Sequence, residues 1–352
     1  MSLLQTHLAD VAHWTENRGE KIPAYFTHVD QERQALDQNA AIVDLSFNGA
    51  IVIAGPQRAD FLSGLITNQI KRVNAQTAIY AALLSAQGRF QWDFTILQID
   101  AEAEGEDPRL LMLLEPGAHT ALFQRLSMYL LRTQATLTDH SEQLGALGVA
   151  GPNALEVLQK TWPDATFSAE LGATVSPQAG VWVIADPRHS LWGYRVIADA
   201  AALPGLWDQL TAHAAPAGFA AWESYRIANA LPRGGGDLVP DLSIPLESGF
   251  LEMNGVDFNK GCYIGQETTA RTYHRGTLKK RLFRLTLEGK PNLGDSVMSG
   301  TDHEVGMVTS VDPNGGQALA VLRASDVADG KPLRVGNTEV KAVSKPTWAT
   351  WE

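Results

Sequence analysis

The sequence predicts an α+β fold of two related units followed by a small β-barrel. Three observations carry this prediction: an internal repeat, a long segment rich in glycine and proline, and short alternating runs near the C-terminus. We expect a first unit over residues 1–140 that shares strands from the later segment, and a second over 141–240. A connection over 241–276 and a barrel over 277–352 would follow. With 352 residues, 45% of them hydrophobic, the chain can fill several cores.

Two segments that begin 96 residues apart (145 − 49) share glycine, alanine and proline positions. They are GAIVIAGPQRADFL from Gly49 and GALGVAGPNALEVL from Gly145. Each predicts a strand, a Gly-Pro turn and an amphipathic helix, because proline is favoured in the first turn of a helix. A weaker similarity sets the strand WDFTI from Trp92 beside WGYRV from Trp192. We infer two related ferredoxin-like units, and chance similarity of short segments is the alternative.

The C-terminal part and the segment before it have different textures. From Leu282 the chain consists of short alternating runs separated by Gly, Pro, Asp and Asn, which is typical of a small all-β barrel or sandwich. Residues 231–267 are dense in glycine and proline and too long for an ordinary connection. Long ordered loops are commonly functional.

Composition limits the classes of function. The single cysteine excludes an internal disulfide and a metal site built from the chain's own cysteines. No apolar run is long enough to span a membrane, and the N-terminus lacks a leader pattern. We therefore predict a cytoplasmic protein, although a processed organellar protein would look the same. The net charge of −11 disfavours nucleic acid and anionic membranes, despite a local basic patch, HRGTLKKR, over 274–281.

The only cysteine, Cys262, lies in the stretch NKGCYIGQET and is the first candidate for chemistry. The Lys260 ammonium beside it would favour the thiolate, which can act as a nucleophile or a metal ligand. Gly261 and Gly265 would let backbone amides approach a ligand, and a helix would begin directly afterwards. The alternative is an inert cysteine packed as a small hydrophobe. A catalytic pair with His274 is not favoured by the spacing.

Two further residues carry charge where the pattern predicts a buried strand or a helix. Asp93 interrupts an apolar strand, so it must be paired, for instance with Arg89, or face a cavity. Its counterpart in the weaker similarity is Gly193, which favours a ligand contact over a demand of the fold. Arg226 lies on a predicted helix over 220–231, and a guanidinium there suits a carboxylate. A structural salt bridge or a surface-facing position for Asp93, and a solvated helix face for Arg226, are the alternatives.

These segments together resemble a known family. KGCYIGQE (260–267), the stretch from Asp44 to Ile70, GRFQWD (88–93) and the following barrel resemble the YgfZ family of folate-binding iron–sulfur assembly factors. Their mitochondrial counterparts are similar, and both are related to the aminomethyltransferase (T-protein) of the glycine cleavage system. The resemblance implies a three-domain cloverleaf around a central hole that receives tetrahydrofolate. It also implies help in assembling or repairing [4Fe–4S] clusters on client enzymes, among them radical-SAM tRNA-modifying proteins.

The resemblance also assigns roles to single residues. Cys262 would be the residue that matters most, as a transient ligand of iron or of a cluster. Asp93 would lie near the pterin–glutamate junction of folate, Arg226 near the same pocket, and Thr67 and Asn68 in a turn lining the hole. The residues framing the cysteine would be Lys260, Gly261, Gly265, Gln266 and Glu267. One departure is Arg195, which stands where the aminomethyltransferase has an acidic residue that holds the pterin.

Three functions follow from these patterns. The first is an accessory factor without ordinary turnover, in which folate is bound and Cys262 is a transient thiolate ligand. Since one cysteine cannot hold a cluster, a partner such as an A-type iron–sulfur carrier or a [4Fe–4S] client would supply the other ligands. The second is a folate-dependent aminomethyl or one-carbon transferase that depends on Asp93. The third, disfavoured by the net charge, is RNA binding by the basic patch.

Overall fold

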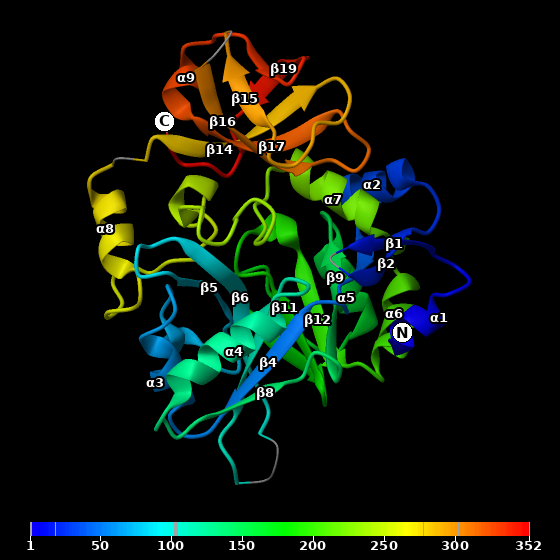
Figure 1. Ribbon diagram of the computed structural model, residues 1–352. Coiled ribbons are helices and arrows are strands. Elements are labelled where there is room, and N and C mark those ends of the chain that lie inside the picture. Colours follow the sequence, from blue (N-terminus) through cyan, green and yellow to red (C-terminus); the bar gives the residue numbers. More distant parts are fainter. Residues whose placement is uncertain (1, 18, 102–104, 277, 301–302, 352) are drawn as a thin grey trace. The chain divides into compact units, whose positions relative to one another are not determined.

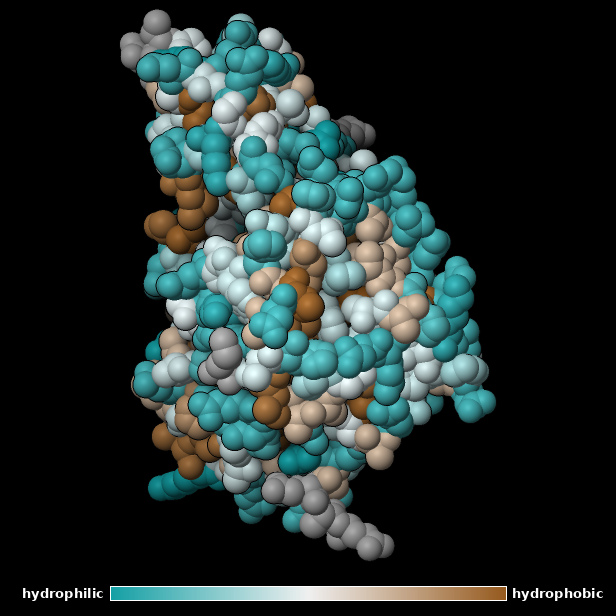
Figure 2. Space-filling model, turned by 90° about the vertical axis from the view of Figure 1, so that its right-hand side faces the viewer, coloured by the Kyte–Doolittle hydropathy of each residue, from teal (hydrophilic) through white to brown (hydrophobic). Residues whose placement is uncertain are grey.

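The computed structural model describes residues 2–17, 19–101, 105–276, 278–300 and 303–351 (Figure 1). The chain divides into two compact units, each assembled from separate stretches of sequence. The first unit comprises residues 1–82, 93–222 and 254–263, and the second comprises residues 83–92, 223–253 and 264–352. Among the described residues, no helix is long and apolar enough to cross a membrane. Polar side chains cover most of the face drawn in Figure 2, with apolar ones in small groups.

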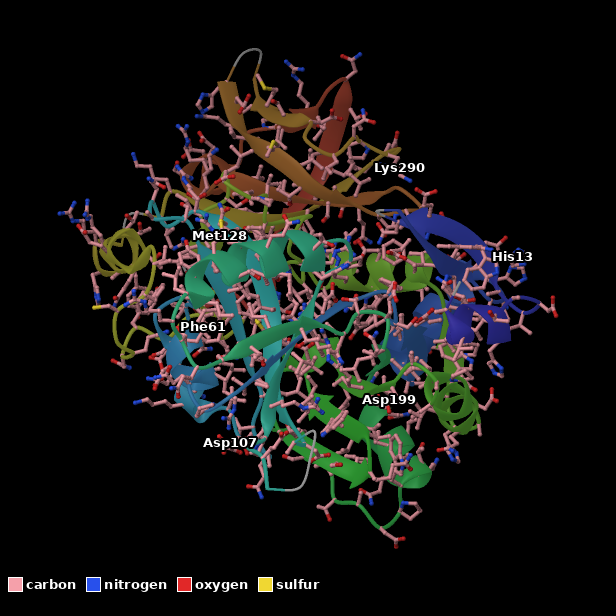
Figure 3. All side chains as sticks on the ribbon, turned by 60° about the horizontal axis from the view of Figure 1, so that its bottom comes forward. His13, Phe61, Asp107, Met128, Asp199 and Lys290 are labelled. Atoms are coloured by element: carbon pink, nitrogen blue, oxygen red, sulfur yellow. The ribbon has the colours of Figure 1, made fainter. Side chains whose placement is uncertain are left out.

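The first unit contains two antiparallel-rich sheets. One has the strand order β5-β6-β7-β4-β8. Its strands are β4 (Gly49–Ala54), β5 (Ile79–Leu84), β6 (Phe90–Ile99), β7 (Arg109–Leu114) and β8 (Thr136–Asp139). Helices α3 (Arg58–Ser63) and α4 (His119–Leu130) belong to this half, and α4 packs on β4 and β8 through buried leucines. Figure 3 labels Phe61, which α3 buries, and Met128, which α4 exposes.

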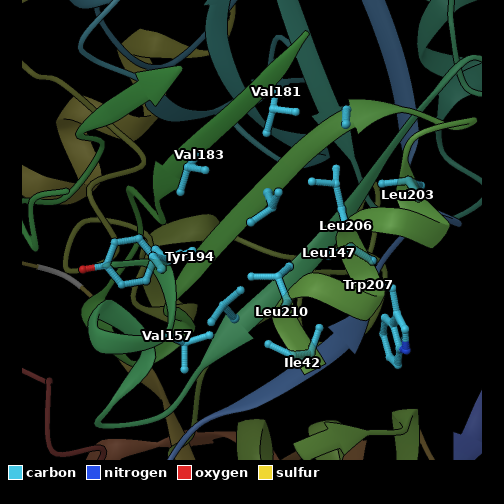
Figure 4. Close-up of a cluster of buried hydrophobic side chains, with 14 of the residues drawn as sticks. Ile42, Leu147, Val157, Val181, Val183, Tyr194, Leu203, Leu206, Trp207 and Leu210 are labelled. Carbon is cyan, nitrogen blue, oxygen red and sulfur yellow. The ribbon is translucent and has the colours of Figure 1, made fainter. Parts of the chain in front are cut away.

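The other sheet has the order β10-β11-β12-β9-β3-β13. Its strands are β3 (Ala41–Asp44), β9 (Leu144–Ala150), β10 (Thr174–Gln178), β11 (Val181–Ala185), β12 (Tyr194–Asp199) and β13 (Ala215–Ala217). Helices α5 (Ala154–Thr161) and α6 (Leu203–Thr211) cover it. Figure 4 shows the core between them, where Ile42 of β3 and Leu147 of β9 lie near Leu206 and Leu210 of α6. All four side chains are almost completely buried.

The predicted repeat is confirmed by the turns after β4 and β9. Gly55 and Gly151 both have positive φ, +98° and +112°. A Cβ atom on either would meet a backbone carbonyl oxygen at 2.7 or 2.6 Å, so both turns require glycine. The residues that precede the two helices, Gln57 and Asn153, have the same backbone angles, φ −99° and ψ 14°. The two halves therefore repeat the same strand–turn–helix unit.

The weaker similarity between Trp92 and Trp192 is wrong as a structural equivalence. Strand β7 pairs with β4 as β12 pairs with β9, so β12 corresponds to β7 and not to β6. Gly193 is therefore not the counterpart of Asp93. The two segments look alike because both place aromatic and β-branched residues in buried strands, which any such strand does.

The N-terminal segment belongs with the second sheet. Strand β3 pairs with β9, Ala41 opposite Ala150, and with the short parallel strand β13. The remaining elements of this segment pack on the same half; they are α1 (Leu3–His7), the hairpin β1 (His13–Asn17) and β2 (Glu20–Tyr25), and α2 (Val29–Gln38). The predicted first unit, 1–140, thus spans both sheets, and the shared strand lies in the second.

The second unit contains the predicted C-terminal barrel, which is closed in the order β14-β17-β16-β15-β18-β19. Its strands are β14 (Lys280–Leu287), β15 (Ser296–Ser299), β16 (His303–Val311), β17 (Gln317–Arg323), β18 (Leu333–Val335) and β19 (Thr338–Ser344). Helix α7 (Phe219–Ala228) leads into this unit, and α8 (Gln266–His274) and α9 (Ala324–Ala328) lie within it. Short 3₁₀ turns occupy Ile70–Arg72, Ser190–Trp192 and Pro245–Ser248.

Candidate functional site

Asp93 lies on β6 inside the first unit and is 6% exposed. Its carboxylate accepts a hydrogen bond of 2.6 Å from the Tyr80 hydroxyl on β5. Burial and the nearby Glu115 carboxylate raise the pKa of Asp93 above its usual value. The pKa of Tyr80 is raised by burial and by Asp93. The structure therefore buries a carboxyl group whose pKa is raised above its ordinary value.

Two arginines and a second aspartate lie in the same unit. Asp186, 1% exposed, accepts hydrogen bonds from Arg188 Nε (2.9 Å) and Nη2 (2.7 Å) and from Arg195 Nε (3.1 Å). Although burial opposes ionisation, the two arginines lower the pKa of Asp186. The Arg188 guanidinium also lies 3.5 Å from the centre of the Trp192 ring and 5.6 Å from that of Tyr80.

The hydrogen bonds in this region account for the charge of Arg195 and distinguish Asp186 from Asp93. Arg195 is bound to Asp186 and its pKa is lowered by burial and by Arg188, so its charge is used within the protein. Asp93, by contrast, has Tyr80 as its one side-chain hydrogen-bond partner among the described residues. A carboxylate has about four acceptor sites. Asp93 is thus the carboxyl group of this cluster with capacity left for a ligand.

Thr67 and Asn68 form a clamp between three segments of the first unit. Thr67 Oγ1 donates to Gly255 O at 2.6 Å and accepts from the Ala82 amide at 2.8 Å. Asn68 Nδ2 donates to Tyr80 O (2.8 Å) and to Asn254 O (2.7 Å). The predicted turn is therefore present, and its polar groups hold the segment before Cys262 against the strand that carries Tyr80.

Asn254 extends this clamp to the arginine cluster. It has a positive φ of +56°, which asparagine tolerates better than most residues. Its side-chain amide donates to Pro187 O and Arg188 O, both at 3.3 Å. A continuous series of contacts thus joins Asp93, Tyr80, Asn68 and Asn254 to the segment of Arg188.

Lys260 is buried, and its ammonium group is hydrogen-bonded within the protein and is not a free charge. Its Nζ donates to the carbonyl oxygens of Ser63 (2.9 Å), Ile66 (2.5 Å) and Asn68 (3.0 Å). Ser63 is the last residue of α3, and Ile66 lies three positions after it. Carbonyl groups at the C-terminal end of a helix lack helical partners and attract a cation. Burial lowers the pKa of Lys260 to about 8. All three donors of the ammonium group are used, so Lys260 fixes the loop to α3 and to the turn at Asn68.

Cys262 is exposed and is a free cysteine. The alternative of a cysteine packed as a small hydrophobe is therefore wrong, because Cys262 is exposed. Gly261 beside it is exposed and has open space where a Cβ would lie. Among the described residues, no group of three or more His, Cys, Asp or Glu could hold a metal ion. Any metal bound by Cys262 would need ligands from another molecule.

The residues after the cysteine begin α8, as predicted. Gly265 precedes the helix with φ +83°, and a Cβ there would lie 2.5 Å from Ser85 O. Gln266 is half-buried in the first turn of α8, and Glu267 is exposed and forms an ion pair with Arg271. Gly265 is therefore required by the backbone, whereas Glu267 lies at the surface.

Arg226 lies in the second unit and is completely buried. Its guanidinium donates to both oxygens of Glu223, to Asp237, to Leu231 O and to Ser310 Oγ. These five bonds use all five N–H groups of an arginine. The predicted solvated helix face is wrong, and a ligand-binding role is not supported by this geometry because no donor is left. Arg226 holds α7, the following loop and the barrel together.

Sequence reasoning missed Tyr80, Glu115, Asp186, Arg188 and Asn254. Tyr80 and Glu115 are close to Asp93 only because three strands pair, which no local pattern shows. Asp186 and Arg188 had a local signal in the stretch VIADPRHSLW, where a carboxylate and a guanidinium follow a fully apolar strand. Charges at such a position need partners.

Comparisons with known proteins agree with this fold. Residues 3–254 match the family model described as the GCVT N-terminal domain, and residues 279–351 match the CAF17 C-terminal beta-barrel domain. The mouse protein named iron-sulfur cluster assembly factor IBA57, mitochondrial, is 32% identical over 84% of this chain and 82% of its own length. The human protein of the same name is 31% identical over the same shares, and the Neurospora crassa homologue is 28% identical over 86% and 69%.

A solved structure shows the same fold across the chain. The crystal structure of glycine cleavage system aminomethyltransferase T from Bartonella henselae matches 99% of this chain and 97% of its own, with a TM-score of 0.82. At 17% sequence identity this likeness concerns the fold alone. The chain therefore has an α+β fold of the aminomethyltransferase type with a closed C-terminal barrel.

Proposed function

Because the chain belongs to the GCVT-domain family that includes the iron–sulfur cluster assembly factor IBA57, we propose that it assists the assembly or repair of [4Fe–4S] clusters and binds tetrahydrofolate. The observation that carries the proposal is the exposed thiol of Cys262 on a loop fastened by Lys260 and Asn68. Thiolate is the ligand expected for such clusters. The cluster is cargo here and is not a resident cofactor.

The thiol acts with a partner protein. One thiolate cannot hold a [4Fe–4S] cluster, and no group of ligands accompanies it among the described residues. An A-type iron–sulfur carrier or a client enzyme, such as a radical-SAM tRNA-modifying enzyme, supplies the other ligands in this proposal. Cys262 then serves as a transient ligand during transfer, which an exposed position permits.

Tetrahydrofolate is proposed to bind at Asp93. The site fits such a ligand in one respect, because Asp93 is buried, has a raised pKa and keeps acceptor capacity. Its carboxyl group would exchange a hydrogen bond with a folate nitrogen. Thr67 and Asn68 would shape the wall of this site through the clamp. Arg226 is no longer proposed as a ligand contact, since its donors are used.

A folate-dependent one-carbon transferase is the second candidate. The raised pKa of Asp93 favours it, because a carboxyl group that keeps its proton to higher pH than usual is suited to act as a general acid. Turnover of a methylene donor that depends on Asp93 and ignores Cys262 would distinguish it.

Two cellular compartments are candidates for this protein. The relatives are named as mitochondrial proteins, whereas the sequence predicted a cytoplasmic one. Fractionation of the source cells with an antibody against the chain would decide between them.

The test is a calorimetric titration of tetrahydrofolate into the reduced wild-type protein and three variants, followed by a cluster-transfer assay. Asp93→Ala is expected to lose binding, and Cys262→Ser to keep binding but lose transfer from an A-type carrier. Asp44→Ala is the matched control, because Asp44 is also buried with a raised pKa but is bonded to the amide of Ser46. Equal transfer with and without the thiol would refute the cluster role, and binding that survives Asp93→Ala would refute the folate site.

A further inference from the structure

Five of the nine residues of helix α8 are exposed, and three more are only partly buried. Of its nine residues only Thr269 is buried. The Tyr273 side chain is 42% exposed and packs edge-on against His274 with ring centres 5.2 Å apart. A helix of this length is marginal on its own, and packing of an apolar face normally stabilises it. α8 buries little apolar surface, and several of its side chains, Tyr273 among them, are exposed to solvent.

The charged residues that follow Glu267 in α8 and those of β14 have one sign. Between Thr268 and Leu287 there is no acidic residue, although the whole chain has 39 acidic and 28 basic residues. The basic residues of this stretch are Arg271, Arg275, Lys279, Lys280, Arg281 and Arg284. A positive surface of this kind attracts an acidic one and is poorly matched to the rest of this acidic protein.

Some of these basic side chains already have ion-pair or hydrogen-bond partners within the protein. Arg271 pairs with Glu267, and Arg284 donates to Ala228 O at 2.7 Å. Glu247 and Glu252 lie close enough to influence Lys280 or Arg281.

Two basic residues differ from the others. Arg275 and Lys279 are exposed, and across the described ranges neither has an ion-pair partner. They are the cations through which an acidic surface would be recognised.

We propose that Tyr273, Arg275 and Lys279, which we name the α8 surface, dock a protein partner through an acidic patch on that partner. The inference rests on the proposed function, because the partner is the protein that shares the cluster with Cys262, a residue four positions before the start of α8. Tyr273 is an aromatic anchor of the kind that dominates interfaces. A nucleic acid fits less well, because the chain carries a net charge of −11 and the α8 surface has one exposed aromatic ring.

The experiment measures binding of a purified A-type carrier by calorimetry at several salt concentrations. The wild-type affinity should fall as salt rises, and Arg275→Glu/Lys279→Glu should weaken binding by about tenfold or more. The matched control is Lys290→Glu/Lys331→Glu, which makes the same change in charge on the barrel, where Figure 3 labels Lys290. It should change the affinity by less than about twofold. Tyr273→Ala should also weaken binding.

Three results would overturn the inference: wild-type affinity in the Arg275→Glu/Lys279→Glu protein, an equal loss in the control, or no binding by the wild type. A single-stranded RNA of about 20 nucleotides is titrated in parallel, and loss of RNA binding with carrier binding unchanged would overturn it in favour of nucleic acid. Cys262→Ser separates this inference from the proposed function. That variant should bind the carrier normally and lose only transfer; normal transfer would refute the role of the thiol and leave the docking surface standing.

Discussion

Each unit buries arginine among carboxylates, but the two clusters differ in how fully their hydrogen bonds are used. In the second unit Arg226 has five protein acceptors for its five N–H groups. In the first unit Arg188 and Arg195 share Asp186, while Asp93 keeps a raised pKa and a single side-chain partner. Burial and charge therefore do not by themselves mark a binding site, and the folate site proposed at Asp93 rests on the unused hydrogen-bonding capacity of its carboxylate.

Arg226→Met should have the largest effect on stability, since it would remove the buried cation that pairs with Asp237 and Glu223, although Glu223 keeps its ion pair with Arg233. We expect a loss of about 3–5 kcal/mol in the free energy of unfolding. Urea denaturation followed by tryptophan fluorescence measures it. Arg226→Lys should lose less, because it keeps the charge but offers three donors rather than five. A near-normal unfolding midpoint for Arg226→Met would show that the second cluster is not structural.

Lys260→Met removes another buried charge, an ammonium group whose three donors are all used in hydrogen bonds to the protein. Three carbonyl groups would lose their donor, and we expect a loss of about 2–4 kcal/mol. The pH dependence has a defined sign. Because the pKa of Lys260 is lowered to about 8 in the fold, the unfolded chain binds more protons between pH 8 and its ordinary pKa of 10.5. Its contribution therefore makes wild-type stability rise with pH through this window, and melting curves from pH 7.5 to 10.5 should show a weaker rise in Lys260→Met.

Gly265→Ala and Gly261→Ala compare filled and open surroundings within one loop. At Gly265 the backbone has φ +83° and a Cβ would lie 2.5 Å from Ser85 O, so we expect a loss of about 1–3 kcal/mol. At Gly261 the space is open, and the change should stay within about 0.5 kcal/mol. Thermal melts of the pair measure the difference. Equal melting temperatures would mean that the loop relaxes around either side chain.

Asp93→Asn should have a small effect on stability, and of the opposite sign. A raised pKa means that the folded state binds the Asp93 proton more tightly than the unfolded chain. Its stabilising contribution is complete below the ordinary pKa of 3.8 and is lost as pH rises through the folded pKa. Asparagine still accepts from Tyr80 but has no charge to bury, so the variant should be more stable at pH 7 by up to about 1 kcal/mol. Lower stability than wild type at pH 7 would contradict the conclusion that burial destabilises the ionised form of Asp93.

The sequence predicted what local patterns encode. The barrel, the helices α3, α5, α7 and α8 and the repeated Gly-Pro turns follow from periodicity and turn residues, and Asp93 stood out because it interrupts an apolar strand. The partners of Asp93 depend on strand pairing over long sequence distances, so Tyr80 and Glu115 had no local signal. Arg226 was predicted as a ligand contact because a buried helix arginine looks the same in sequence whether its acceptors come from a ligand or from the protein.

The position of β3 sets the order in which the protein can complete its structure during synthesis. Ala41 pairs with Ala150, so the first strand of the second sheet leaves the ribosome 109 residues (150 − 41) before its neighbour. Its edges then have no partner for about 5–20 s at ordinary rates of translation. The first sheet, whose strands all come from residues 49–139, can form in the meantime. Strand β3 is therefore a part of the nascent chain that needs protection from pairing with other chains during this interval.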